Sequence, residues 1–220
     1  MNILVVAPHP DDETLGCGGT LYRHKREGNE LYWITVTKIS VEAGWSVETV
    51  KAREDEIDTV ADKYGFQDVF QFGLPTTRID TLPISDLIAK LTAVYSKIEP
   101  GIIYMPFSHD VHTDHQFVAT AMQSTYKWFR SPHIQKVLMY ETVSETEYNF
   151  AEDRIFRPNV FVDISNYLDD KIEIMKLYKS EIGEFPFPRC ETTVRSLAAF
   201  RGSQGGFEAA EAFELVYERN

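Results

Sequence analysis

Short apolar runs alternate with helical patterns along this chain, and no other feature constrains its fold as strongly. The runs are rich in Val, Ile and Leu and lack strict polar alternation, which is typical of strands covered on both faces. The pattern predicts strands at about 2–7, 31–37, 69–72, 102–106, 136–141 and 159–164. Strands separated by helices favour a parallel sheet, because parallel neighbours need a crossover connection.

The helical segments carry recognisable ends. A helix is predicted at about 85–98, where Ser85 can cap the first turn. A second is predicted at about 47–64 and is followed by Gly65, which suits the end of a helix. Further helices are expected at about 14–26, 115–128, 167–180 and 190–201. We therefore expect an α/β fold with a Rossmann-like, doubly wound, mostly parallel sheet and helices on both faces.

The 220 residues are enough for one α/β domain and few for two. No internal repeat, low-complexity tract or long linker divides the chain, so residues 1–220 are interpreted as a single domain. The alternation of strands and helices weakens after about residue 145. We consider the segment 145–220 a candidate for an appended cap that completes the site.

The charge balance narrows the classes of partner. The net charge of −12 repels phosphate backbones and anionic membranes, so nucleic-acid binding is not expected. The first apolar run has no basic flank and is broken by Pro8 and His9, which predicts a buried strand and neither a signal peptide nor a membrane span. Cys17 and Cys190 form no paired motif, which favours free thiols in a reducing cytoplasm. A homo-oligomer is left open.

The polar segment Pro8–Glu13 (PHPDDE) follows the first predicted strand, and ligands of open α/β sheets bind at the carboxyl ends of strands. It holds three carboxylates and a histidine within five residues, which repel one another unless a cation or a helix N-terminus offsets their charge. Pro8 and Pro10 stiffen the loop. The alternative is an acidic cap for the next helix, but the histidine and the prolines favour a binding loop.

Three glycines, Gly16, Gly18 and Gly19, follow this loop. Their pattern, GCGG, differs from the G-x-G-x-x-G of dinucleotide-binding loops, and the acidic segment before it would repel a pyrophosphate. The glycines are therefore interpreted as small residues that let a helix pack closely on the sheet.

A second polar segment, Ser108–His115 (SHDVHTDH), follows the fourth predicted strand and holds three of the six histidines. His112 and His115 are three residues apart, so a helical turn would place both on one face. Histidines commonly ligate metals, and carboxylates serve as ligands or as hydrogen-bond partners of ligating histidines. His24 and His133 have no such neighbours and are interpreted as surface residues.

The expected strand order 3-2-1-4-5-6 brings the two polar segments together, because the first and fourth strands are then neighbours. Two residues of the first segment and one histidine of the second would supply three nitrogen and oxygen ligands and leave a fourth position for water. That arrangement is typical of a catalytic zinc, and the chain lacks the cysteines of a structural zinc site.

Arg53 lies on the face of its predicted helix that also carries Val50, Ile57 and Val60. An arginine there needs a carboxylate, a carbonyl or an anionic group as partner. The alternative is a stem packed on the core with its guanidinium in water.

Together, His9–Glu13 (HPDDE) and His112–His115 (HTDH) resemble the LmbE-like, or PIG-L, family of zinc-dependent de-N-acetylases. Arg53 and Glu56 resemble the R-x-x-E helix of that family. Its RG…AEAF segment is matched by Arg201-Gly202 and Ala210–Phe213. The resemblance covers most of the chain, although Pro188-Arg189-Cys190-Glu191 departs from the HPRS sequence of many members.

The resemblance assigns roles to individual residues. It implies that zinc is held by His9, Asp12 and His115. It implies that Asp11 is the general base and that His112 stabilises the oxyanion, with Asp114 orienting a histidine. Arg53 is placed with the catalytic set, whereas Glu13 is expected to cap the following helix. We expect Asp114 to raise the pKa of His112, since the oxyanion role calls for a proton on that ring.

The implied reaction is removal of an acetyl group from an N-acetylated amino sugar, with a small molecule as substrate. Two alternatives remain at this stage. One is a zinc amidase acting on another N-acyl group or on a thiol-sugar conjugate. The other is a metal-binding or nucleotide-binding module without turnover, although such a module would need neither Asp11 nor His112.

Overall fold

The computed structural model describes residues 1–220 and contains one seven-stranded sheet. Its strands are β1 (Asn2–Ala7), β2 (Glu30–Lys38), β3 (Asp68–Pro75), β4 (Ile102–Pro106), β5 (Lys136–Tyr140), β6 (Val160–Asp163) and β7 (Ala210–Glu218). They lie in the order β3-β2-β1-β4-β5-β7-β6. Strands β1 to β5 are parallel, whereas β7 is antiparallel to both β5 and β6.

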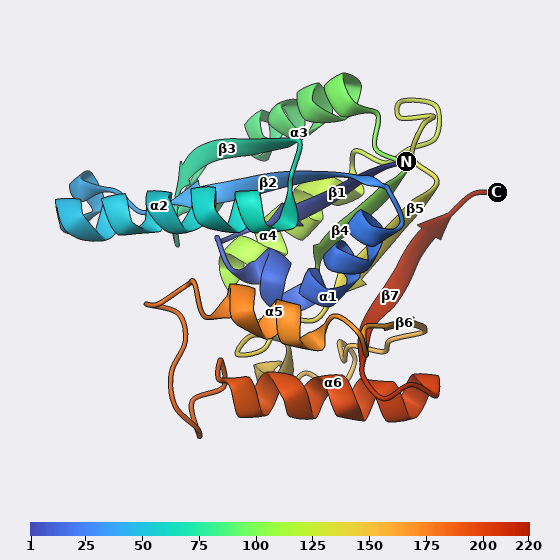
Figure 1. Ribbon diagram of the computed structural model, residues 1–220. Coiled ribbons are helices and arrows are strands. Elements are labelled where there is room, and N and C mark those ends of the chain that lie inside the picture. Colours follow the sequence, from blue (N-terminus) through green and yellow to red (C-terminus); the bar gives the residue numbers. More distant parts are fainter.

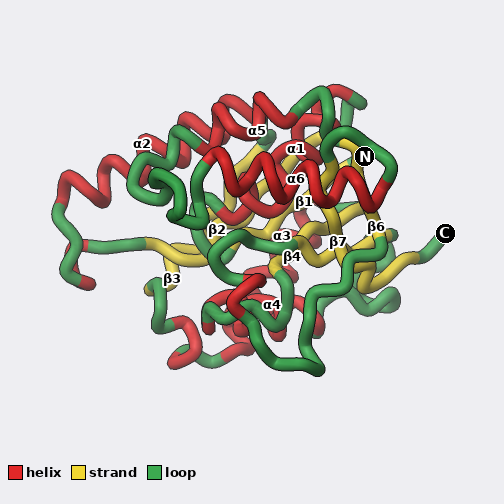
Figure 2. The backbone as a smooth tube through the Cα atoms, turned by 90° about the horizontal axis from the view of Figure 1, so that it is seen from below, coloured by secondary structure: helices red, strands yellow, loops and turns green.

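Helices cover both faces of the sheet. They are α1 (Asp12–Arg26), α2 (Val47–Tyr64), α3 (Ile84–Ile98), α4 (Thr113–Gln123), α5 (Leu168–Met175) and α6 (Glu191–Gly205). Figure 2 shows α1, α2, α5 and α6 on one side of the strands and α4 on the other. In Figure 1 both chain ends lie at the right, and the parallel strands point to the left, toward the amino end of α2. The expected α/β fold is confirmed.

Alternate residues of β1 face the two helical layers. Leu4 and Val6 are fully buried in the apolar cluster that includes α3 and α4. Ile3 and Val5 are fully buried in the cluster that includes α1 and α2. A strand buried on both faces reads as a continuous apolar run, which is why this segment shows no polar alternation.

The C-terminal third differs from the expected order. Strand β7 was not predicted as a strand; it lies between β5 and β6, so the expected neighbours at 136–141 and 159–164 do not pair. Phe213 is fully buried and is paired with Tyr140 on one side and with Val160 on the other. Its neighbours in sequence, small and acidic residues, carry little β propensity, and the pairing is stabilised by residues distant in the chain.

Two helices end earlier than expected. Helix α4 ends at Gln123 instead of about 128, and Thr125 donates its hydroxyl proton back to the carbonyl of Met122. Helix α5 ends at Met175 instead of about 180. The chain then leaves the helix, and the Tyr178 hydroxyl donates to the Glu13 carboxylate at 2.7 Å.

The glycine run packs α1 closely on its neighbours, as expected. A Cβ atom added at Gly16 would lie 2.2 Å from the Tyr140 ring, and one at Gly19 would lie 2.8 Å from the side chain of Ile164. Such separations are far below van der Waals contact, so only glycine fits at these positions.

Helix α1 is kinked at Cys17, where φ is −144° and ψ is 23°. A buried ion pair satisfies backbone groups near the kink. The Lys171 ammonium donates to the Leu15 carbonyl at 2.8 Å and to Glu211 at 2.6 Å. The Glu211 carboxylate accepts from the backbone N–H groups of Gly19 and Thr20. Residues from α5 and β7 therefore complete the hydrogen bonding of α1.

His24 and His133 were expected at the surface, and this is wrong for His24. Its side chain is only 14% exposed, and Nε2 lies 2.9 Å from the Tyr104 hydroxyl. Asn29 donates to Nδ1. Burial lowers the pKa of His24 to about 4, whereas His133 is half-buried with a pKa lowered by the same cause.

This burial predicts acid sensitivity. Folded His24 binds fewer protons than the unfolded side chain. The stability that the buried neutral ring contributes is therefore fully present above about pH 6.5 and is lost as the pH falls toward 4. Between pH 7 and 4.5 we expect wild-type protein to lose about 2 kcal/mol more stability than His24→Gln. Urea unfolding in the presence of chelator measures both. Equal losses in the two proteins would contradict the assignment.

Candidate metal centre

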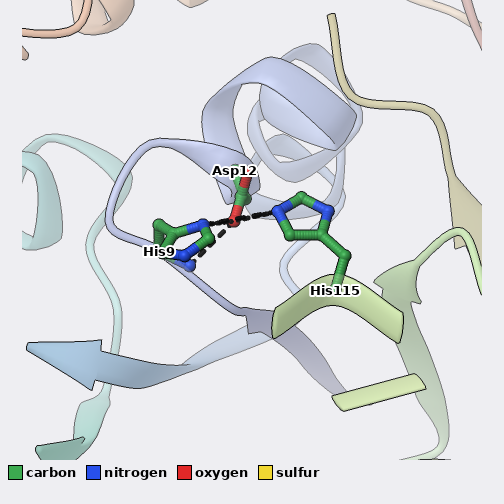
Figure 3. A group of neighbouring side chains, drawn as sticks. All are labelled: His9, Asp12 and His115. Carbon is green, nitrogen blue, oxygen red and sulfur yellow. Dashed lines mark hydrogen bonds and ion pairs between the residues drawn. The ribbon is translucent and has the colours of Figure 1, made fainter. Parts of the chain in front are cut away.

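Three side chains from two separate segments converge at the carboxyl ends of β1 and β4. His9 lies in the loop after β1, Asp12 begins α1, and His115 lies in the first turn of α4. Asp12 Oδ2 is 3.3 Å from His9 Nδ1 and 3.2 Å from His115 Nε2, and the two nitrogens are 3.3 Å apart. Figure 3 shows both rings turned toward the carboxylate.

This triangle fits a metal ion. Ligand atoms about 2.0–2.1 Å from a tetrahedral metal are separated by about 3.3–3.4 Å. The outer nitrogen of each ring is held by a carboxylate: Asp114 lies 3.0 Å from His9 Nε2, and Asp110 lies 2.8 Å from His115 Nδ1. Such pairs orient ligating histidines and leave the inner nitrogens free to bind a cation.

A second group, His9, His112 and Asp114, is also close enough to share an ion. Two of its polar atoms already accept backbone hydrogen bonds, however. His112 Nδ1 accepts the backbone N–H of Asp114 as the N-cap of α4, and Asp114 Oδ2 accepts from the backbone N–H of Thr77 at 2.8 Å. The first group is therefore the better metal site.

The charges of the first group depend on one another. Burial disfavours a charged ring, yet hydrogen bonds to Asp114 and Asp12 raise the pKa of His9 to about 9. Burial opposes the charge of Asp12 as well, but the neighbouring His115 keeps the pKa of that carboxyl low. A cation entering this site must displace protons, so its affinity rises with pH.

His112 differs from the sequence expectation. Burial, with the charges of His9 and His115, lowers the pKa of His112 to about 4, and the opposing effect of Asp114 is too small to raise it. Because Nδ1 accepts a hydrogen bond, the ring proton lies on Nε2. The lowered pKa favours a neutral ring that can donate a hydrogen bond from Nε2, whereas the sequence predicted a raised pKa.

Asp11 occupies an unusual backbone position. Its φ of 136° is rare outside glycine, and its side chain makes no capping hydrogen bond to α1. Asp11 is 4% exposed, and its carboxylate accepts from Arg189 at 3.1 Å. Burial and the charge of Asp12 raise the pKa of Asp11 well above its ordinary value, while Arg189 opposes this shift.

Arg53 has the partners that its position called for. It donates to the Pro10 carbonyl at 2.9 Å and forms ion pairs with Glu56 and Glu181. Glu181 also pairs with Arg189 at 3.2 Å. The guanidinium therefore ties the first loop to the segment between α5 and α6.

One cavity of about 380 Å³ collects these residues. It is lined by six predicted site residues: His9, Asp11, Asp12, Arg53, His112 and His115. Asp114 does not line it and lies behind His9. Sequence reasoning missed Glu181 and Arg189, although the Pro188–Glu191 segment stood out as a departure from the family pattern.

Glu13 lies beside this centre but faces away from the cavity. Its carboxylate accepts from the backbone N–H of Asp11, as a capping residue does, and also from Thr14 and Tyr178. Burial raises the pKa of Glu13 to about 7 despite these hydrogen bonds.

Helices long and apolar enough to cross a membrane are absent from the chain.

Comparisons with known proteins agree with this geometry. The family model PIG-L, GlcNAc-PI de-N-acetylase, matches residues 4–126. A diacetylchitobiose deacetylase of Thermococcus kodakarensis is 26% identical over 97% of this chain and 82% of its own length. A probable N-acetyl-alpha-D-glucosaminyl L-malate deacetylase 2 of Bacillus cereus is 24% identical over 82% of this chain and 83% of its own.

A solved structure shares the fold. The N,N'-diacetylchitobiose deacetylase of Pyrococcus horikoshii superposes with a TM-score of 0.76 at 21% identity, covering 98% of this chain and 84% of that one. This similarity supports the α/β fold.

The choice between the two groups predicts metal content. Protein purified without added metal is expected to hold one divalent ion per chain, and His115→Ala is expected to lose it because a ligand is removed. His112→Ala is expected to retain it. Elemental analysis, with circular dichroism to verify folding, measures both variants. Loss in His112→Ala with retention in His115→Ala would select the second group.

Proposed function

Since this chain belongs to the PIG-L family of de-N-acetylases, we propose that it is a zinc-dependent hydrolase that removes the acetyl group of an N-acetylated amino sugar. The observation that carries the proposal is the convergence of His9, Asp12 and His115 beside the buried carboxylate of Asp11. Relatives named for chitobiose and glucosaminyl malate support an N-acetylglucosamine-type substrate. The bond cleaved is the amide bond between the acetyl group and the sugar nitrogen.

Two imidazoles and one carboxylate suit zinc, which favours nitrogen and oxygen ligands in catalytic sites. When bound, zinc supplies a Lewis acid that polarises the amide carbonyl and lowers the pKa of water. Asp114 and Asp110 keep the rings of His9 and His115 in the binding orientation.

Asp11 is assigned as the general base. It lines the cavity, it neighbours the ligand Asp12, and its raised pKa makes it a stronger proton acceptor than an ordinary aspartate. After taking the proton from the attacking water, the same carboxyl group can return it to the nitrogen of the leaving amine. The Asp11 carboxylate makes no capping hydrogen bond to α1, and Arg189 holds it in position by donating a hydrogen bond to it.

His112 is assigned to the developing oxyanion. A neutral ring with its proton on Nε2 donates one hydrogen bond and needs no positive charge to do so. Asp114 acts through His9, and its backbone N–H fixes the tautomer of His112. Arg53 positions the first loop through the Pro10 carbonyl.

Residues 1–220 are proposed to act as one domain, because Glu181 and Arg189 of the C-terminal third line the same cavity as the first loop. The buried free thiols of Cys17 and Cys190 support a cytoplasmic location.

The reaction is tested by acetate release. Zinc-loaded protein is incubated with free, nucleotide-linked and lipid-linked N-acetylglucosamine and with an N-butyryl analogue, with and without chelator. Chelator-sensitive release of acetate supports the proposal. Faster release of the longer acyl group would favour a different amidase, and the absence of any release would favour a binding module.

Asp11→Asn is expected to retain zinc and to lower kcat by about 10²-fold or more, because the amide keeps the shape but cannot accept a proton. Glu13→Gln is the matched control and is expected to remain within about tenfold of wild type. A large loss in Glu13→Gln with an active Asp11→Asn would move the base to Glu13.

His112→Ala is expected to lose about 10²–10³-fold in kcat, as when another oxyanion donor is removed. Both limbs of its kcat/KM profile are expected to persist, since a neutral His112 does not titrate in the working range. Steady-state kinetics from pH 5.5 to 9 measure this. Disappearance of the alkaline limb in this variant would show that His112 works as an imidazolium.

A further inference from the structure

The cations that line the metal cavity are already paired. Three lysine and arginine side chains line it: Lys38, Arg53 and Arg189. Lys38 contacts Glu54 at 2.6 Å. Arg53 and Arg189 share Glu181, and each has a second carboxylate partner. A phosphate or carboxylate entering the cavity would therefore have to compete with an existing ion pair.

One carboxylate of the cavity has no cationic partner. Glu145 lines the cavity, is half-buried, and forms no ion pair with a lysine, an arginine or a histidine. Its side-chain hydrogen bond comes from the neighbouring Ser144 hydroxyl at a long 3.4 Å. This carboxylate retains most of its capacity to accept hydrogen bonds.

An unsatisfied hydroxyl lies in the same turn. Thr142 is 2% exposed, and its Oγ1 has no hydrogen-bond partner in the chain. Thr142 lines the metal cavity and also a neighbouring cavity of about 350 Å³, so the turn forms the partition between them. A buried polar atom without a partner is costly unless a ligand or water satisfies it.

The turn is held in fixed relation to the metal centre. Ser144 adopts φ of 81°, and the backbone N–H groups of Glu145 and Thr146 both donate to the Thr142 carbonyl. The Thr146 hydroxyl donates to Asp110, the carboxylate that orients His115. A group bound at this turn would therefore be positioned relative to the scissile amide.

We propose that Thr142 and Glu145 form a subsite for the part of the substrate attached to the N-acetylated sugar, and that this subsite selects conjugates rich in hydroxyl or ammonium donors over anionic ones. The proposal rests on the deacetylase function proposed above. Sugar hydroxyls and ammonium groups donate charge-assisted hydrogen bonds to a carboxylate, whereas a phosphate or carboxylate at the same place is repelled. A neutral or amino-bearing disaccharide has the required chemistry.

Three substrates test the charge preference with zinc-loaded wild-type protein: N,N'-diacetylchitobiose, its analogue with one free amine, and N-acetylglucosamine 1-phosphate. The kcat/KM values of the neutral and cationic disaccharides are expected to exceed that of the phosphate by at least about tenfold. Equal values, or a preference for the phosphate, would overturn the subsite. Failure to release acetate from all three and from the wider screen would instead count against the deacetylase function.

Glu145→Gln keeps the shape and removes the charge. It is expected to raise KM for the two disaccharides by about tenfold with little change in kcat. The ratio of their kcat/KM values to that of the phosphate is expected to fall. Glu152→Gln removes the same charge from an exposed position of the following loop and is expected to change nothing. An unchanged substrate preference in Glu145→Gln would contradict the assignment.

Thr142→Val separates binding from folding. The hydroxyl has no partner in the free protein, so a purely structural residue would be neutral or stabilised by this change. We expect an unchanged or higher Tm together with a several-fold higher KM for the disaccharides. An unchanged KM would show that the hydroxyl does not contact substrate.

Discussion

Three consecutive carboxylates, Asp11, Asp12 and Glu13, are buried where β1 meets α1, and the rest of the site compensates for them. Asp12 is matched by the two histidines, which together suit a cation. Asp11 is matched by Arg189 from the C-terminal third. Glu13 has no positively charged side chain as partner. It accepts three hydrogen bonds, and burial raises its pKa to about 7. Each carboxylate therefore has its own environment and a separate acid–base behaviour.

The sequence was most informative where chemistry is concentrated in short segments. The polar residues after β1 and β4 predicted a shared site, because adjacent parallel strands present their carboxyl ends at one edge. The glycine run predicted close packing of α1, and the contacts of Gly16 and Gly19 agree. Both inferences depend on local patterns and on one general rule of sheet topology.

Features created by distant residues were not predictable in this way. Strand β7 pairs with β5 and β6 from opposite sides, and its register is set by partners distant in the sequence, the nearest being the pair Asp163 and Ala210. Glu181 and Arg189 reach the first loop only after α5 ends at Met175. The tautomer of His112 depends on a backbone N–H that becomes available at the start of α4. None of these interactions leaves a periodic signal in the sequence.

The same distance effects explain why the C-terminal third affects the metal centre without supplying a ligand. The glycines bring α1 against the sheet and its neighbours, and the kink at Cys17 leaves backbone groups that must find partners. Lys171 and Glu211 supply them from α5 and β7, and they are buried together as an ion pair. Because Asp12 begins this helix, the geometry of the metal site depends on a pair of residues that does not line the metal cavity. Removing either Lys171 or Glu211 would leave the charge of the other buried beside α1. The ion pair therefore affects the metal site through the position of α1.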